Sequence, residues 1–145
     1  MRLSLLFAVL LVAPMLGSNS PKEYDDRMEA VGIQGTWELI EIELKGEKVK
    51  SDSHETLLTF RDESFTANDR QLGIHRGSYR IYFTRKPYHL DLSYVDGDTK
   101  GPTHKFIFQI DGETLRIAET DVPNDERRPQ GFNGAVEVFT YKRVK

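Results

Sequence analysis

From Gly35 to Lys145 the chain is a series of short β-type runs separated by turn residues, and this pattern restricts the fold more than any other feature. No stretch within it has the length and periodicity of a helix, which argues against parallel strands joined by helical crossovers. Evenly spaced short strands favour an antiparallel meander that closes into a barrel or forms a sandwich. The eight expected strands are Thr36–Leu44, Leu57–Phe60, Phe65–Ala67, Gly73–Phe83, Tyr88–Tyr94, a run through Phe106–Ile110, a run through Leu115–Ile117, and Val136–Val144.

Side-chain alternation within these runs indicates which faces are buried. In Tyr88–Tyr94, large apolar side chains alternate with polar ones such as Asp91, so one face of this strand is expected to lie in water. In Thr36–Leu44 the alternation changes phase after Leu39, which predicts a β-bulge or a sharp bend. In Val136–Val144 both faces carry large side chains, and the core face cannot be assigned.

The segment 20–32, ahead of the strands, has the sequence marks of one short helix. Ser20 can cap it, Pro21 is tolerated in the first turn because its missing N–H has no partner there, and Glu23 can complete a capping box. Gly32 provides a natural C-terminal stop. The apolar stripe at helical spacing consists of Tyr24, Met28 and Val31.

The first residues are expected to be a secretory signal peptide that ends near Gly17. Arg2 is followed by the apolar run Leu3–Val12 and then by small residues, in the order typical of such signals. The run is shorter than the ~20 residues that a membrane span requires; the alternative is an N-terminal membrane anchor. We therefore expect a signal peptide at 1–17, an N-terminal segment with the helix at 18–34, a barrel domain at 35–145, and a periplasmic or extracellular location.

Composition restricts the classes of partner and chemistry. The net charge is −3, and the 20 basic and 23 acidic residues are interleaved, so the basic stripe typical of nucleic-acid binding is missing from the sequence. Cysteine is absent, which excludes thiol catalysis and Cys-ligated zinc. After removal of the signal, no further membrane span is expected.

Motifs for catalysis or metal binding are weak. Gly77-Ser78-Tyr79 lacks the glycine spacing of a hydrolase elbow, and Asp96-Gly97-Asp98 lacks the remainder of a calcium loop. Asp91 and Asp111 could act as an acid and base, but both fall where exposed side chains are expected. We expect no enzyme activity, no catalytic or metal-binding residues and no cofactor. The four histidines, on separate segments and at surface or rim positions, are His54, His75, His89 and His104.

Gly35-Thr36-Trp37, placed on the first strand after a short helix, resembles the G-x-W signature of the lipocalin and calycin barrels. That resemblance implies an all-β, eight-stranded antiparallel up-and-down barrel with a short N-terminal helix. It also implies that Trp37 lies at the closed end of the barrel and that Arg143 packs across it. More narrowly, the chain is similar to a bacterial lipocalin-like family of planctomycete type, for which the resemblance implies fold and supplies no catalytic residues. The ordered landmarks of this likeness are Gln34–Leu39, Leu58-Thr59-Phe60, Gly77-Ser78-Tyr79, Leu90-Asp91-Leu92, Asp111–Leu115, Arg128-Pro129, Phe132 and Lys142–Lys145.

The aromatic residues suggest two classes of function. An eight-stranded barrel can be filled by its own side chains or can hold one small ligand. The first hypothesis is a binding module for a small apolar or amphipathic molecule, with the loop Thr120–Gly134 as a rim or lid. The second is a protein-interaction or inhibitor module that has a packed core and acts through surface loops; a cavity of about 300 Å³ or more favours the first. The candidate ligand-lining residues are Phe60, Phe65, Tyr79, Phe83, Leu90, Leu92, Phe106 and Phe108.

Overall fold

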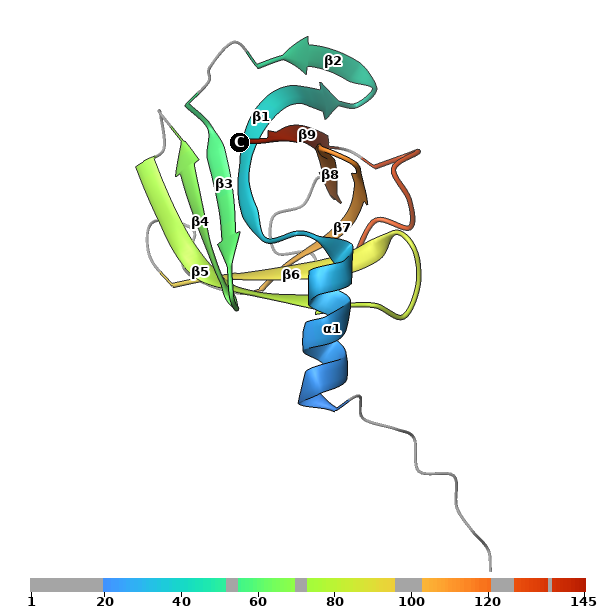
Figure 1. Ribbon diagram of the computed structural model, residues 1–145. Coiled ribbons are helices and arrows are strands. Elements are labelled where there is room, and N and C mark those ends of the chain that lie inside the picture. The colour runs from blue at the N-terminus through green and yellow to red at the C-terminus, as the bar shows by residue number, and fades with distance from the viewer. Residues whose placement is uncertain (1–19, 52–54, 70–72, 96–102, 121–126, 136) are drawn as a thin grey trace, which may run out of the picture.

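The protein is a closed antiparallel barrel with one helix at its end (Figure 1). A computed structural model describes residues 20–51, 55–69, 73–95, 103–120, 127–135 and 137–145. The sheet order is β2-β1-β3-β4-β5-β6-β7-β8-β9, and pairing of β1 with β9 closes it. The predicted eight-stranded up-and-down barrel with a short helix is confirmed. The elements are α1 (Pro21–Val31), β1 (Gly35–Leu44), β2 (Glu47–Lys50), β3 (Leu57–Arg61), β4 (Ser64–Asp69), β5 (Gly73–Tyr82), β6 (Tyr88–Tyr94), β7 (His104–Asp111), β8 (Thr114–Glu119) and β9 (Glu137–Arg143).

Strand β1 closes the barrel because it has a partner along both of its edges. One edge pairs with β9, and the register shifts between Leu39 and Glu41. This irregularity is the predicted bulge. It lets Trp37 and Leu39 face the interior before the shift and Ile42 face it afterwards, since Ile42 pairs with the inward-facing Phe139 of β9.

The other edge of β1 is divided between two strands. Its first half pairs with β3, from Gly35 opposite Phe60 to Glu38 opposite Leu57. Its second half pairs with β2, a strand that we did not predict from the sequence. All four residues of β2 are exposed, so its sequence Glu-Lys-Val-Lys carries no apolar alternation to reveal it.

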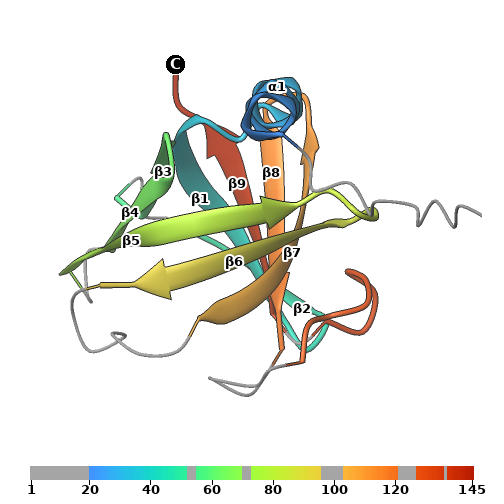
Figure 2. The ribbon, with the colours of Figure 1, turned by 90° about the horizontal axis from the view of Figure 1, so that it is seen from below.

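Helix α1 covers one end of the barrel, at the end opposite β2 (Figure 2). The Ser20 hydroxyl accepts a hydrogen bond from Glu23 N, and Gly32 ends the helix with a left-handed φ of 70°. Buried Met28 packs onto the barrel core. The Tyr24 hydroxyl accepts from Ile81 N (3.1 Å), on the part of β5 that extends beyond its pairing with β4. The predicted helix, its Ser20 cap and its Gly32 stop are confirmed, whereas the Glu23 carboxylate pairs with Arg27 (2.9 Å).

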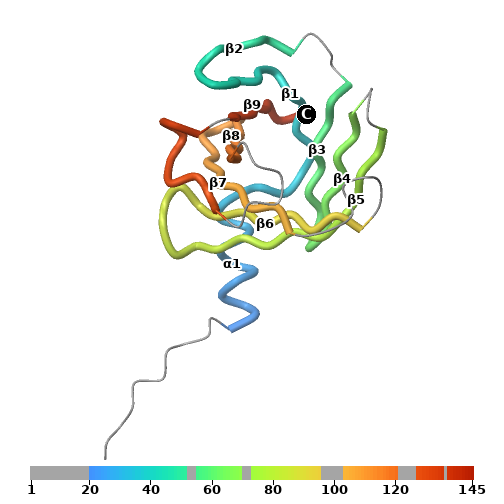
Figure 3. Tube along the Cα trace, turned by 180° about the vertical axis from the view of Figure 1, so that it is seen from behind, coloured from blue at the N-terminus to red at the C-terminus, as the bar shows by residue number. Residues whose placement is uncertain are grey.

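A second, smaller apolar cluster lies on the outer wall of the barrel. It consists of Ile107, Ala118 and Val138, one each from β7, β8 and β9, and it is covered by Phe132 and Ala135 of the loop before β9. Both faces of β9 are therefore packed, which explains why its core face could not be assigned from the sequence. The described part of the loop Thr120–Gly134 lies along this wall, so the expectation of a rim or lid is wrong for residues 127–134 (Figures 1 and 3).

The same loop corrects the expectation for Asp91. Arg128 forms an ion pair with Asp91, and it also donates to the backbone oxygen of Leu90 (3.1 Å) on β6. The Asp91 side chain is only 15% exposed, and that of Arg128 only 12%. The alternation of β6 was interpreted correctly, but the face expected to lie in water is covered here by a distant segment.

Candidate functional site

The two ends of the barrel interior differ, and the end beneath α1 is filled. Trp37 is fully buried and its indole N–H donates to the backbone oxygen of Ile33 (2.8 Å). The guanidinium of Arg143 lies 4.0 Å from the centre of the Trp37 ring. It also donates to the backbone oxygens of Gln34 (2.8 Å) and Gly32 (2.6 Å). One cation thus stacks on the indole and satisfies two carbonyl groups between the helix and β1.

Gly35 is required by this arrangement for two reasons. Its φ of 118° is unfavourable for any residue with a side chain, and a Cβ there would lie 3.1 Å from Nη1 of Arg143. Gly77 on β5 is required for a different reason, because its Cβ would lie 2.1 Å from the backbone oxygen of Ser93. The ring of Phe65 packs against the space that this glycine leaves.

The eight aromatic and aliphatic residues proposed to line a ligand site fall into three groups. Phe60, Phe65, Leu90 and Phe108 are at most 2% exposed and belong to the packed core. Tyr79 and Phe83 border a groove beside α1. Leu92 and Phe106 line a cavity at the opposite end of the interior.

The cavity at this open end has a volume of about 320 Å³. Its walls come from six barrel strands, β3, β4, β6, β7, β8 and β9. Most of the lining side chains are apolar or aromatic, and the polar ones converge from β6 to β9. The lining residues are Leu58, Ala67, Leu92, Tyr94, His104, Phe106, Ile117, Glu119, Thr120, Glu137, Phe139 and Tyr141.

Two carboxyl groups face each other inside the cavity. Glu119 at the end of β8 and Glu137 at the start of β9 are direct partners in the β8–β9 register. Like charges opposite one another in a sheet are unfavourable. Burial, the adjacent Glu137 charge and a hydrogen bond to Glu137 raise the pKa of Glu119 to about 7. Near neutral pH the two carboxyl groups can therefore share a proton.

Hydroxyl and imidazole groups complete the polar side of the cavity. Burial, followed by the charge of Glu119, raises the pKa of Tyr94 to about 12. Burial likewise raises the pKa of Tyr141, and it lowers the pKa of His104. The tyrosines therefore keep their protons and the imidazole is neutral at pH 7, which leaves the glutamates as the charged groups. Among the described residues that line this cavity, none is lysine or arginine.

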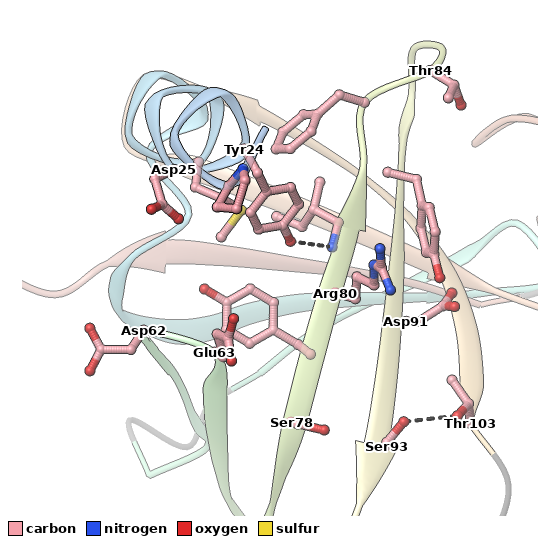
Figure 4. A pocket seen from close by; sticks show the side chains of 16 residues that line it. Tyr24, Asp25, Asp62, Glu63, Ser78, Arg80, Thr84, Asp91, Ser93 and Thr103 are labelled. Atoms are coloured by element: carbon pink, nitrogen blue, oxygen red, sulfur yellow. Dashed lines mark hydrogen bonds between the residues drawn. The ribbon is translucent and has the colours of Figure 1, made fainter. Parts of the chain in front are cut away.

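The larger groove beside α1 is a weaker candidate. It measures about 830 Å³ and is lined by residues from α1 and from both faces of β5 (Figure 4). Asp25, Asp62 and Glu63 stand at its border and are separated along it rather than directed at one point (Figure 4). The Gln34 amide donates to the Tyr79 hydroxyl (2.6 Å) and to the backbone oxygen of Asp62, which links the residue before β1 to the β3–β4 turn. These bonds serve the fold.

The histidines occupy different environments. His75 and His104 both contact the Tyr94 ring, at centroid distances of 6.4 and 5.2 Å. His89 lies on the outer wall and accepts from Nε of Arg85 (2.9 Å). His54 and the Asp96-Gly97-Asp98 turn fall outside the described residues, as do the signal peptide and its boundary.

No group of three His, Asp or Glu side chains among the described residues is arranged to hold a metal ion. No helix within the same residues is sufficiently long and apolar to cross a membrane.

The alternation of the sequence marks Glu119 but not Glu137, because both faces of β9 carry large side chains. Glu119 shares the parity of Leu115 and Ile117, and Glu137 shares that of Phe139 and Tyr141. A carboxylate that continues the core-facing pattern of a strand marks either a strand end or a polar group inside the barrel. Pairing Glu119 with Glu137 required the β8–β9 register, which the sequence does not specify.

Comparison with known proteins supports the fold. No protein-family model and no curated protein sequence matches the chain, so the narrower likeness to a planctomycete-type family is not supported. Among solved structures, the chain is similar to a lipocalin-like protein from Bacteroides uniformis ATCC 8492, with 15% identity and a TM-score of 0.52. The match covers 77% of this chain and 98% of that one. The chain therefore has the lipocalin-like barrel fold.

Proposed function

We propose that the protein is an exported binding protein that takes a small amphipathic molecule into the cavity at the open end of the barrel. The observation that carries this proposal is the division of the interior, which is packed beneath α1 and hollow between β4, β6, β7 and β9. A volume of about 320 Å³ lies at the lower end of the range for small-ligand pockets, about 300–1,000 Å³. The ligand is accordingly small.

The lining of the cavity fits this role. Apolar walls remove the body of a ligand from water, and a few convergent polar groups fix its orientation. Leu92, Phe106 and Phe139 supply such walls, while Tyr94 and Tyr141 supply hydroxyl groups. The proposed activity is binding and not catalysis, in keeping with the lipocalin-like fold.

Native mass spectrometry of the protein purified from the compartment to which its own cells export it tests the proposal. We expect a reproducible bound small molecule that is lost on unfolding. The variant Ala67→Phe, which places a ring in the cavity, should lose it. The control Ile74→Phe adds the same ring at an exposed position on the adjacent strand β5 and should retain it. A bare mass for the wild type would overturn the proposal.

The alternative is a protein-interaction or inhibitor module, and the same experiment distinguishes it from a small-molecule binding protein. That hypothesis needs a filled barrel and free surface loops. The described part of the longest loop is instead packed against the outer wall through Phe132 and Arg128. A bare mass together with capture of a protein partner would favour the alternative.

A further inference from the structure

The cavity at the open end carries an acidic centre surrounded by aromatic rings. Glu119 and Glu137 come from paired strands and meet inside the barrel. A protein that needed only a filled interior would gain stability from apolar residues at these two positions, because opposed like charges are unfavourable. Departures from local preference are expected where a site serves a ligand.

The aromatic residues around the pair suit a positive charge. Tyr94 and Phe106 stand on β6 and β7, and Phe139 and Tyr141 follow Glu137 on β9. The faces of aromatic rings attract cations, most strongly where water is excluded. An anion would meet one or two carboxylates at short range, and a neutral molecule would leave their charge uncompensated.

We propose that the ligand of this cavity is a small amphipathic amine, whose ammonium group binds between Glu119 and Glu137 while its apolar part lies against the aromatic walls. This inference rests on the proposed binding function and specifies its chemistry. The ammonium takes the place of the proton that the carboxyl pair otherwise shares. Binding therefore releases that proton to solvent near neutral pH, and both carboxylates are charged in the complex.

The neighbouring titratable groups allow this proton to be assigned. Tyr94 on β6, His104 on β7 and Tyr141 on β9 line the same cavity. Asp69, at the end of β4, contributes charge near Tyr141. The two tyrosines keep their protons at pH 7 because their pKa values are raised, and the pKa of His104 is lowered. Among the groups that line the cavity, the one left to release a proton near pH 7 is the glutamate pair.

Isothermal titration calorimetry with hexylamine, hexanol and hexanoate tests the proposal, because the three probes share one tail and differ in head group. At pH 8 we expect hexylamine to bind at least about tenfold more tightly than either of the others. In buffers of different ionisation enthalpy near pH 6.5, up to one proton should be released per amine bound. The amine preference should disappear in Glu119→Gln and persist in Glu29→Gln, an exposed carboxylate on α1.

The outcomes separate the two proposals. Hexanol or hexanoate binding as tightly as hexylamine would overturn the amine assignment and leave the binding function standing. An amine preference unchanged in Glu119→Gln would overturn the assignment as well. No binding of any of the three probes would overturn both.

Discussion

Both ends of the barrel combine charged side chains with aromatic rings, but the charges have partners at one end and oppose each other at the other. Beneath α1, the charged Arg143 is stacked on Trp37 and its N–H groups are directed at backbone oxygens of Gln34 and Gly32. At the open end, Glu119 and Glu137 face one another with aromatic rings around them and a cavity beside them. The first arrangement gives the cation an aromatic face and two hydrogen-bond acceptors, which stabilises the fold. The second leaves like charges opposed, and we infer that a ligand resolves this conflict.

The largest expected effect is at the filled end. Replacing Trp37 with Ala should lower the free energy of unfolding by about 3–5 kcal/mol, because a fully buried indole leaves a cavity that the surrounding core cannot fill. Urea unfolding followed by circular dichroism measures this. The matched variant Phe139→Ala, at a half-buried position beside the existing cavity, should cost less than half as much. Equal losses at the two positions would break the distinction between the ends.

A smaller loss is expected when the cation at the filled end is removed. Arg143→Gln should lower the unfolding free energy by about 1.5–3 kcal/mol, since two carbonyl oxygens lose charged hydrogen-bond donors. The control is Lys142→Gln, which neutralises an exposed cation at the adjacent position. Denaturant midpoints of the two variants would show the difference. Similar midpoints would mean that Arg143 acts only through net charge.

At the open end the expected effect depends on pH and has the opposite sign. The pKa of Glu119 is raised to about 7 in the folded protein, so folding favours its protonated form, and its contribution to stability is lost as pH rises from about 4.5 to 7. Glu119→Gln removes this loss. The variant should therefore gain stability relative to the wild type across that interval and keep the gain at pH 8. Thermal unfolding at several pH values measures it, with Glu29→Gln as the control. A difference independent of pH would contradict the shared proton.

The smallest effect is expected outside the barrel wall. Val49 on β2 is 64% exposed and faces no core cluster among the described residues. Val49→Thr should change the unfolding free energy by less than about 0.5 kcal/mol. Chemical unfolding would check this. A larger loss would show that β2 contributes to the stability of the open end.

The strand pattern was predictable because it depends on local alternation. The eight barrel strands, the bulge after Leu39 and the capped helix all follow from residue types at short spacing. Strand β2 was missed because its exposed residues carry no alternation. The covering of Asp91 was missed because its partner, Arg128, lies 37 positions later in the chain.

The candidate site was predictable only in part. Large inward-facing side chains were recognised, but parity cannot separate a packed ring such as Phe108 from a cavity-lining one such as Phe106. The two residues are two positions apart and lie on the same face of β7. They differ in their depth along the barrel axis, which alternation along one strand does not reveal.

The sequence by itself determined the class of the fold, because alternation, turn residues and glycine positions act over a few residues. Gly35 before Trp37, the Ser20 and Gly32 helix caps and the regular strand spacing are of this kind. Only the tertiary structure decided which end of the barrel is filled and that Glu119 meets Glu137. Those outcomes depend on register and on closure between β1 and β9, which bring together residues that are far apart in the chain.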